Sequence, residues 1–153
     1  MEIYIENQQQ NQQFNPERLQ QIASRILNAL GCPEDAELSV LIVDDPAIQR
    51  INRDYLERDR PTNVISFSQQ EGDIPDFAET GMLLGDVVIS ADTAWRDARE
   101  AGIDMFAEMV FLLLHGILHL LGYDHERGST EEAELMEEKE REIYALLQAE
   151  GLI

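Results

Sequence analysis

The chain has 153 residues, of which 44% are hydrophobic, and it carries 31 acidic against 11 basic side chains, for a formal charge of -20 at pH 7. This length and apolar content suit one domain with one core, and the net charge argues against a general nucleic-acid binder unless basic residues gather locally. One cysteine, Cys32, excludes an intramolecular disulfide and favours a reducing compartment.

The sequence contains no pattern typical of export or of a membrane segment. The N-terminus lacks a basic segment followed by an apolar one, so we expect no signal peptide. The longest apolar stretch, residues 105–121, contains Glu108 and two histidines and is short for a bilayer span, which favours a buried helix. We therefore expect a cytoplasmic protein that does not enter a membrane.

Hydrophobic periodicity and cap signals predict a single domain over residues 1–153. In chain order we expect a strand at 3–5, a helix at 16–30, a strand at 38–43, a helix at 46–56, strands at 64–67 and 83–89, and helices at 91–101, 104–121 and 130–149. Asn15 and Asp45, each followed by proline, and Ser129, with an acid three residues later, predict N-caps. This order predicts an α+β fold, in which one mixed sheet of about four strands packs against about five helices.

Two further segments have structural interpretations. The aromatic residues Trp95, Phe106 and Phe111 are expected in the core. Residues 68–82 contain two glycines and a proline among acidic residues, which predicts a mobile loop within the domain.

All three histidines lie within eleven residues, at His115, His119 and His125. The first two are four residues apart in a helical segment, so their rings lie on one face, close enough to share an ion. Gly122 can adopt a positive φ and end the helix, which lets His125 approach from a third direction. Three neutral imidazoles favour Zn²⁺, although Ni²⁺ or another divalent metal also accepts them. Without a fourth Cys or His nearby, one coordination position stays open, as in catalytic sites.

This segment has other interpretations. Single histidines are often core residues or helix caps, but three at these offsets favour a metal. The pattern H-x-x-x-H-x-x-G-x-x-H is similar to that of the metzincin proteases, except that Gly116 replaces their catalytic glutamate. A metallopeptidase is therefore an alternative, as is a non-catalytic assembly factor in which zinc only supports folding.

Residues 115–125, HGILHLLGYDH, resemble the signature of the YbeY family of bacterial metal-dependent endoribonucleases and rRNA maturation factors. Residues 59–67, DRPTNVISF, resemble the family's D-x-P-T-[ND]-V-L-S-F, and residues 84–90, LGDVVIS, resemble its L-G-D-[IL]-x-I-[SC]. In the family's terms, the helix that carries the first two histidines would be a zincin-like metal helix. The resemblance implies that the three histidines bind zinc and act in catalysis through it.

The resemblance also implies partners. The substrate would be RNA, chiefly ribosomal precursor RNA, and a ribosomal subunit or ribosomal protein would be a partner in ribosome maturation and quality control. One departure concerns Tyr55, which is followed by Leu56 where some members carry an arginine treated as functionally important. That role is not carried over to this chain.

Basic residues gather in one segment despite the negative net charge. Arg50, Arg53, Arg58 and Arg60 fall within eleven positions, and cationic side chains stabilise the charge that develops on a phosphoryl group during cleavage. Arg58, Arg60 and Asn63 are therefore the candidate substrate-binding residues. The alternative is that these arginines form surface ion pairs with neighbouring acids.

The sequence indicates no general base for hydrolysis. Asp124, beside a predicted ligand, is a candidate to orient a histidine ring by hydrogen bonding, and its alternative role is that of a turn residue. Asp86, on a predicted strand, is a further candidate to face the site.

Overall fold

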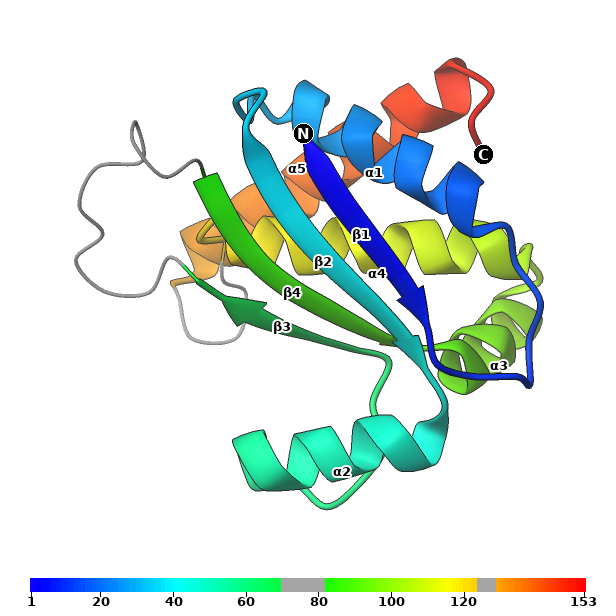
Figure 1. The fold of residues 1–153 in the computed structure, drawn as a ribbon. Helices are drawn as coiled ribbons and strands as arrows, with labels where there is room; N and C mark the ends of the chain where they lie inside the picture. The colour runs from blue at the N-terminus through cyan, green and yellow to red at the C-terminus, as the bar shows by residue number, and fades with distance from the viewer. Residues whose placement is uncertain (70–81, 124–128) are drawn as a thin grey trace.

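A mixed four-stranded sheet lies at the centre of the molecule (Figure 1). Its strands, in the order in which they lie side by side, are β1 (Glu2–Asn7), β2 (Ala36–Val43), β4 (Met82–Ser90) and β3 (Val64–Ser68). β2 is parallel to β1 and to β4, whereas β3 is antiparallel to β4 and ends the sheet. The computed structural model describes residues 1–69, 82–123 and 129–153, so nearly all of the predicted mobile loop lies outside the described residues.

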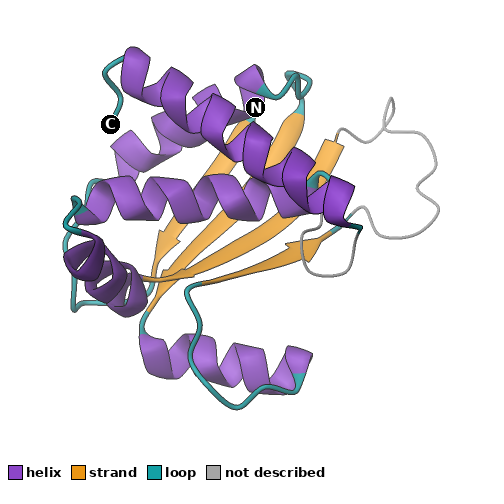
Figure 2. Ribbon diagram, turned by 180° about the vertical axis from the view of Figure 1, so that it is seen from behind, coloured by secondary structure: helices purple, strands orange, loops and turns teal. Residues whose placement is uncertain are grey.

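Within the described residues, the helices are α1 (Pro16–Ala29), α2 (Asp45–Leu56), α3 (Ala91–Ala101), α4 (Met105–Leu120) and α5 (Thr130–Ala149). α1 and α4 cover one face of the sheet, α5 packs outside them, and α2 lies on the other face (Figures 1 and 2). The predicted α+β fold of four strands and five helices is confirmed.

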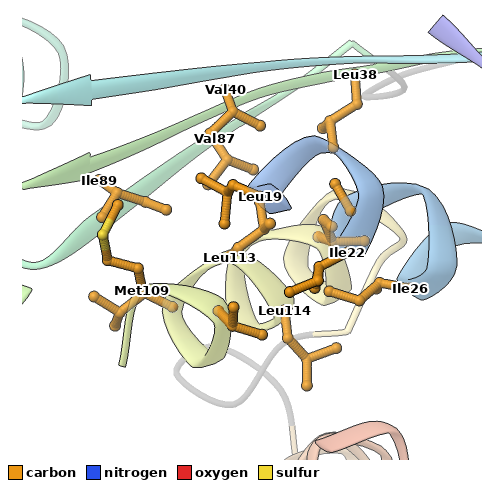
Figure 3. Packing of buried hydrophobic residues seen from close by; sticks show 14 of the residues in the cluster. Leu19, Ile22, Ile26, Leu38, Val40, Val87, Ile89, Met109, Leu113 and Leu114 are labelled. Atoms are coloured by element: carbon orange, nitrogen blue, oxygen red, sulfur yellow. The ribbon is translucent and has the colours of Figure 1, made fainter. Parts of the chain in front are cut away.

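α4 is the central helix of the main core. Its Leu113 and Leu114 pack with Ile22 of α1 beneath Val40 and Val87 of the sheet (Figure 3). Burial of each such side chain stabilises the fold by about 1.5–3 kcal/mol. The position of α4 relative to the sheet is therefore fixed by many apolar contacts, which matters because this helix carries two of the predicted metal ligands.

A smaller apolar cluster fixes α2 on the opposite face. Ile48 of α2 packs with Val43, Ile65 and Val88, which come from three different strands. Because side chains alternate between the two faces of a strand, Val88 contacts α2 while its neighbour Val87 contacts the α4 side. One face of the sheet thus borders the main core with α4, and the opposite face borders the smaller apolar cluster with α2.

The helix N-caps agree with the sequence at two positions and differ at one. Asn15 Oδ1 accepts a hydrogen bond from Arg18 N (3.1 Å), and Ser129 Oγ accepts one from Glu132 N (3.2 Å), as predicted. The prediction of Asp45 as a cap is wrong, since Asp44 Oδ1 caps α2 by accepting from Ala47 N at 2.9 Å. The side chain of Asp45 instead joins α2 to α3.

The side chain of Trp95 is not in the core as predicted. It is 38% exposed on α3, and the Arg99 guanidinium carbon lies 4.7 Å from the centre of its ring. An indole often covers apolar surface with one face and meets a cation with the other. Phe106 and Phe111 are partly buried.

Among the described residues, no single helix has the length and apolar composition to cross a bilayer. α3 and α4 together have the required length and apolar composition, but the chain bends by 115° between them.

Candidate metal centre

One stripe of α4 remains partly exposed. Between Met109 and Leu120, every residue is buried except Phe111, His115 and His119, which are spaced four residues apart. Four residues are slightly more than one helical turn, so these three side chains lie along a single line on the helix surface. The apolar residues that fix α4 in the core therefore also fix where the two histidine rings point.

His115 and His119 bring the same ring nitrogen toward one point. Their Nε2 atoms are 3.2 Å apart, and the two ring centres are 4.7 Å apart at an interplanar angle of 74°. Two nitrogens that bind one tetrahedral ion at about 2.0–2.1 Å each are about 3.3 Å from one another. The pair thus has the spacing that a shared Zn²⁺ ion requires, although a hydrogen bond between the two rings has the same spacing.

α4 ends directly after these two histidines. Gly122 has a φ of 98°, its N–H donates to His119 O (3.0 Å), and Tyr123 N donates to Leu118 O (3.0 Å). The predicted end of the helix at a glycine with positive φ is confirmed. The next residues are 124–128, so the predicted third ligand His125 and the candidate Asp124 both lie outside the described residues.

Only two predicted ligands can therefore be placed. Within residues 1–69, 82–123 and 129–153, no group of three His, Cys, Asp or Glu side chains is arranged to hold a metal ion. A complete centre depends on a further ligand from outside the described residues, and His125 stays a prediction for that role.

Gly116 allows α4 to lie directly on the sheet. A Cβ atom at this position would be 2.7 Å from Val87 Cγ1 and 3.1 Å from Ser66 Oγ, and Ser66 Oγ donates to Gly116 O at 3.1 Å. No side chain fits there without a shift of the helix or the strand. The glutamate that metzincins carry after their first histidine would point into the β3–β4 packing, which argues against the metallopeptidase alternative.

A residue that was not predicted from the sequence contacts the site from α5. Glu140 is 8% exposed, and its Oε1 lies 2.6 Å from His115 Nδ1, the ring nitrogen that faces away from His119. A sequence signal for it exists, because Glu140 stands in line with the buried Met136, Ile143 and Leu147 of α5. An acid at an apolar position of an amphipathic helix indicates a buried partner.

The surroundings of His115 toward the start of α4 are largely apolar. Phe111 packs edge-on against Tyr144 of α5, with ring centres 6.0 Å apart. Burial, with a smaller contribution from Asp97, raises the pKa of Glu108 on α4, and burial followed by the charge of Glu108 raises the pKa of Tyr144.

The candidate arginines lie on the opposite side of the sheet, at and after α2. Arg58 and Arg60 are exposed, and the backbone of their loop is held by Asn52, whose Nδ2 donates to Arg60 O (2.9 Å) and whose O accepts from Arg58 N (3.2 Å). Asn52 itself is only 3% exposed. The loop is thus fixed through its backbone, while its cationic side chains extend into solvent.

The ion-pair alternative holds for one of these arginines. Arg53 pairs with Asp54 at 3.0 Å, whereas Arg50, Arg58 and Arg60 form no ion pair with any described residue. Within the described part of the chain, no carboxylate therefore competes with an anion for these three side chains.

Asp45, an acid at the start of α2, has partners outside this arginine segment. Its carboxylate accepts hydrogen bonds from Ser90 Oγ (2.6 Å), Thr93 Oγ1 (2.7 Å) and Arg96 (2.6 Å). Burial opposes ionisation, but these three bonds together lower the pKa of Asp45. The charge of Asp45 is used to join α2 to the start of α3.

Two other candidates are placed away from the histidine pair. Asn63 Oδ1 accepts from Val64 N (2.8 Å), and its backbone oxygen accepts from Ser90 N (2.9 Å), so it shapes the start of β3. Asn63 lies three residues, about 10 Å, from Ser66 along the strand. Ser66 in turn contacts the helical turn of α4 that carries His115. Asp86 precedes Val87 and thus faces the α2 side, so the prediction that it faces the site is wrong.

Comparisons with known proteins address the whole chain. The family model described as endoribonuclease YbeY matches residues 4–148. The chain is 61% identical over 150 residues to a protein named endoribonuclease YbeY from Syntrophotalea carbinolica, covering 98% of each, and 54% identical over 153 residues to one from Geobacter metallireducens, covering 100% of each. The solution structure of TM1509 from Thermotoga maritima superposes with a TM-score of 0.61 over 98% of this chain and 94% of that one, at 24% identity, which is a likeness of fold.

Proposed function

Because the chain belongs to the YbeY endoribonuclease family, we propose that it is a zinc-dependent endoribonuclease that cleaves single-stranded regions of ribosomal precursor RNA. The observation that carries the metal dependence is the 3.2 Å separation of the His115 and His119 Nε2 atoms on the partly exposed stripe of α4. Zinc is the first choice because imidazole nitrogens suit it, and Ni²⁺ or another divalent ion is the alternative.

In this proposal the ion is held by His115, His119 and His125, which act in catalysis through it. A bound divalent ion supplies Lewis-acid polarisation of a phosphoryl oxygen and activation of water for hydrolysis. The contribution of the chain is to fix the ring orientations, because both described histidines are anchored by a buried helix, and to keep one side of the site open to RNA.

The substrate would reach the site from the arginine-bearing surface. Tyr55, near the end of α2, is 71% exposed and contacts Phe67 of β3 with ring centres 5.5 Å apart. α2 and α4 end at the same end of the sheet (Figure 1). The contact with Phe67 therefore puts Tyr55 and the following Arg58 near β3, the edge strand whose Ser66 also contacts the helical turn of α4 that carries His115. Arginines beside an exposed aromatic ring are a combination that suits the backbone and bases of single-stranded RNA. Arg58 and Arg60 are the proposed phosphate-binding residues, whereas Asn63 would act through the shape of its loop.

The proposed cellular setting is ribosome maturation and quality control in the cytoplasm, with a ribosomal subunit or ribosomal protein as partner. The net charge of -20 supports a basic protein partner in addition to RNA, because opposite charges steer association. RNA would then be engaged by the local basic segment and a ribosomal protein by the acidic remainder of the surface.

Cleavage assays test this proposal directly. Zinc-loaded protein is expected to cut ribosomal precursor RNA, to lose activity with a chelator and regain it when Zn²⁺ is restored, and His119→Ala is expected to be inactive while keeping its far-UV circular dichroism. Intact precursor RNA after incubation with the zinc-loaded chain, together with unchanged rRNA ends in cells that carry only His119→Ala, would refute the proposal.

The same experiments separate the alternatives. A non-catalytic assembly factor that needs zinc only to fold would lose its circular dichroism on addition of the chelator, whereas a catalytic centre keeps its fold. A metallopeptidase would hydrolyse casein in a chelator-sensitive manner, which Gly116 and its contact with Val87 lead us not to expect.

A further inference from the structure

Glu140 occupies a position on α5 that an apolar residue would normally fill. It lies in line with the buried residues Met136, Ile143 and Leu147, and its own exposure is 8%. A carboxylate at such a position loses its hydration and is tolerated only when a hydrogen-bonding partner compensates. The partner here is the imidazole of His115, whose Nδ1 lies 2.6 Å from Glu140 Oε1.

The contrast with the rest of α5 indicates that this placement is specific. The helix carries many other acids, and the neighbouring Glu137 and Glu138 are exposed to solvent. Of the charged residues in the described part of the chain, Glu140 is the one that is buried. An excess of acid on this helix therefore does not by itself explain why one carboxylate is directed inward at a histidine.

The geometry has a direct consequence for the ring of His115. A carboxylate can only accept hydrogen bonds, so a proton on Nδ1 is required for the 2.6 Å contact when Glu140 is ionised. A neutral imidazole with its proton on Nδ1 has its lone pair on Nε2, and Nε2 is the atom that lies 3.2 Å from His119 Nε2. The acid on α5 thus selects the tautomer in which His115 can bind a metal ion on the His119 side.

We infer that Glu140 is a positioning residue of the metal centre, which fixes the orientation and tautomer of His115 from α5. The inference rests on the proposed metal function and adds the residue that prepares one ligand for it. Carboxylates that orient metal-binding histidines in this way change metal affinity by about 10–100-fold when they are removed. A purely structural role, in which Glu140 only joins α5 to α4, would change stability and leave metal affinity unaltered.

Zinc affinity of the full chain separates these two roles. The metal-free protein is titrated with Zn²⁺ in competition with a chromophoric chelator, for the native chain and for Glu140→Met, Glu140→Gln and Glu137→Met. Glu140→Met, which places an apolar side chain of similar length in an apolar position, is expected to bind zinc about 10–100-fold more weakly. Glu140→Gln is expected to lose less, because its amide oxygen can still accept from His115 Nδ1. Glu137→Met makes the same chemical change on the same helix at an exposed position, and its affinity is expected to stay within about twofold of the native value.

The tautomer gives a second measurement that needs no metal and no activity. Nitrogen-15 NMR of the metal-free chain is expected to show the Nδ1–H form of His115 in the native protein and a shift toward the Nε2–H form in Glu140→Met. Circular dichroism confirms that each variant is folded, and Glu140→Leu, which also removes the hydrogen-bond acceptor, provides both measurements if Glu140→Met does not fold.

The outcomes are distinguishable from a failure of the proposed function. Native protein that binds zinc, with an unchanged affinity and an unchanged His115 tautomer in the Glu140 variants, overturns the role of Glu140 alone. Native protein that binds no zinc overturns the proposed metal dependence and this role with it.

Discussion

The two faces of the sheet present their polar groups in opposite ways. On the α4 face, His115 and His119 are the polar residues of a buried helical segment, and His115 also contacts the buried Glu140. On the α2 face, Arg58 and Arg60 extend from an exposed loop of which only the backbone is held, by Asn52. On the first face packing fixes the directions of the histidine side chains, whereas on the second it fixes only the backbone path of the arginine-bearing loop.

This difference corresponds to two requirements of catalysis. Groups that bind a metal must be held within a fraction of an ångström, and buried elements with supporting hydrogen bonds provide this. Groups that contact a long, variable polyanion need to adapt, and exposed cations on a loop can do so. We therefore expect substitutions of the polar residues on the α4 face to change stability and chemistry together, and substitutions of the exposed arginines on the α2 face to change RNA binding alone.

Gly116 gives the strongest test of how tightly the α4 face is packed. Gly116→Glu, which restores the acid of the metzincin pattern, is expected to prevent native folding, because a Cβ there already lies 2.7 Å from Val87 Cγ1. Gly116→Ala is expected to cost about 1–3 kcal/mol through overpacking, which is a fall in Tm of roughly 2–12 °C for a domain of this size. Thermal unfolding followed by circular dichroism measures both.

Gly31→Ala is the matched control for this substitution. Gly31 has a φ of 78°, and a Cβ at this position would meet no atom within 4 Å, so only backbone strain opposes the change. It is expected to lower stability by about 1–2 kcal/mol without altering RNA cleavage. Native stability and casein hydrolysis in Gly116→Glu would contradict the tight packing of α4 on the sheet and revive the peptidase alternative.

The two histidines are expected to differ in their effect on stability. His115→Ala leaves the carboxylate of Glu140 buried without its imidazole partner, which costs about 1–3 kcal/mol. His119→Ala is expected to cost less, while it removes metal binding to the same extent. Urea unfolding of the metal-free variants gives the two values, and equal values would mean that the contact between Glu140 and His115 contributes no stability.

Removal of the arginines is expected to have a smaller and different effect. Arg58→Ala and Arg60→Ala are each expected to weaken RNA binding several-fold and to reduce the salt dependence of binding by about one counterion for each phosphate that the variant no longer binds. Their Tm and zinc affinity should match those of the native chain, because both side chains are exposed. Filter binding of single-stranded RNA at several salt concentrations is the measurement, with Arg53→Ala, whose side chain is already paired with Asp54, as the control.

The sequence predicted what depends on local spacing. His115 and His119 could be paired because one helical turn brings them together, and Asn15 and Ser129 could be assigned as caps because a cap binds the backbone only a few residues away. Glu140 was missed because it lies 25 residues from His115, and only the packing of α5 against α4 brings the two into contact.

The other differences have the same origin. Asp45 and Trp95 were misassigned because the partners that decide their roles lie on other segments or on the surface. For Asp45 the residues that bind its carboxylate stand on β4 and α3, far along the chain, and the adjacent Asp44 takes the capping role instead. Tertiary contacts of this kind leave only a weak trace in the sequence, namely a polar residue in an apolar line, as at Glu140.

Glu108 gives the smallest predicted effect and tests the apolar surroundings of the α4 stripe. Burial, followed by the charge of Asp97, raises the pKa of this carboxyl above its ordinary 4.5, so the folded state holds the proton more tightly than the unfolded state does. The stability contributed by the protonated Glu108 carboxyl is therefore fully present below pH 4.5 and is lost as the pH rises through the pKa of the folded state. Glu108→Gln removes that loss and is expected to raise Tm at pH 7 by about 1–3 °C, since the partly exposed group is worth less than about 1 kcal/mol.

The pH dependence distinguishes this cause from a general effect of the glutamine. The gain in Tm should disappear in melts performed well below pH 4.5, where both states of the native chain carry the proton. Glu137→Gln, on the exposed surface of α5, should change Tm little at either pH. A gain for Glu108→Gln of equal size at both pH values would mean that burial does not penalise the carboxylate, and that the surface beside the histidines is more open to water than its contacts indicate.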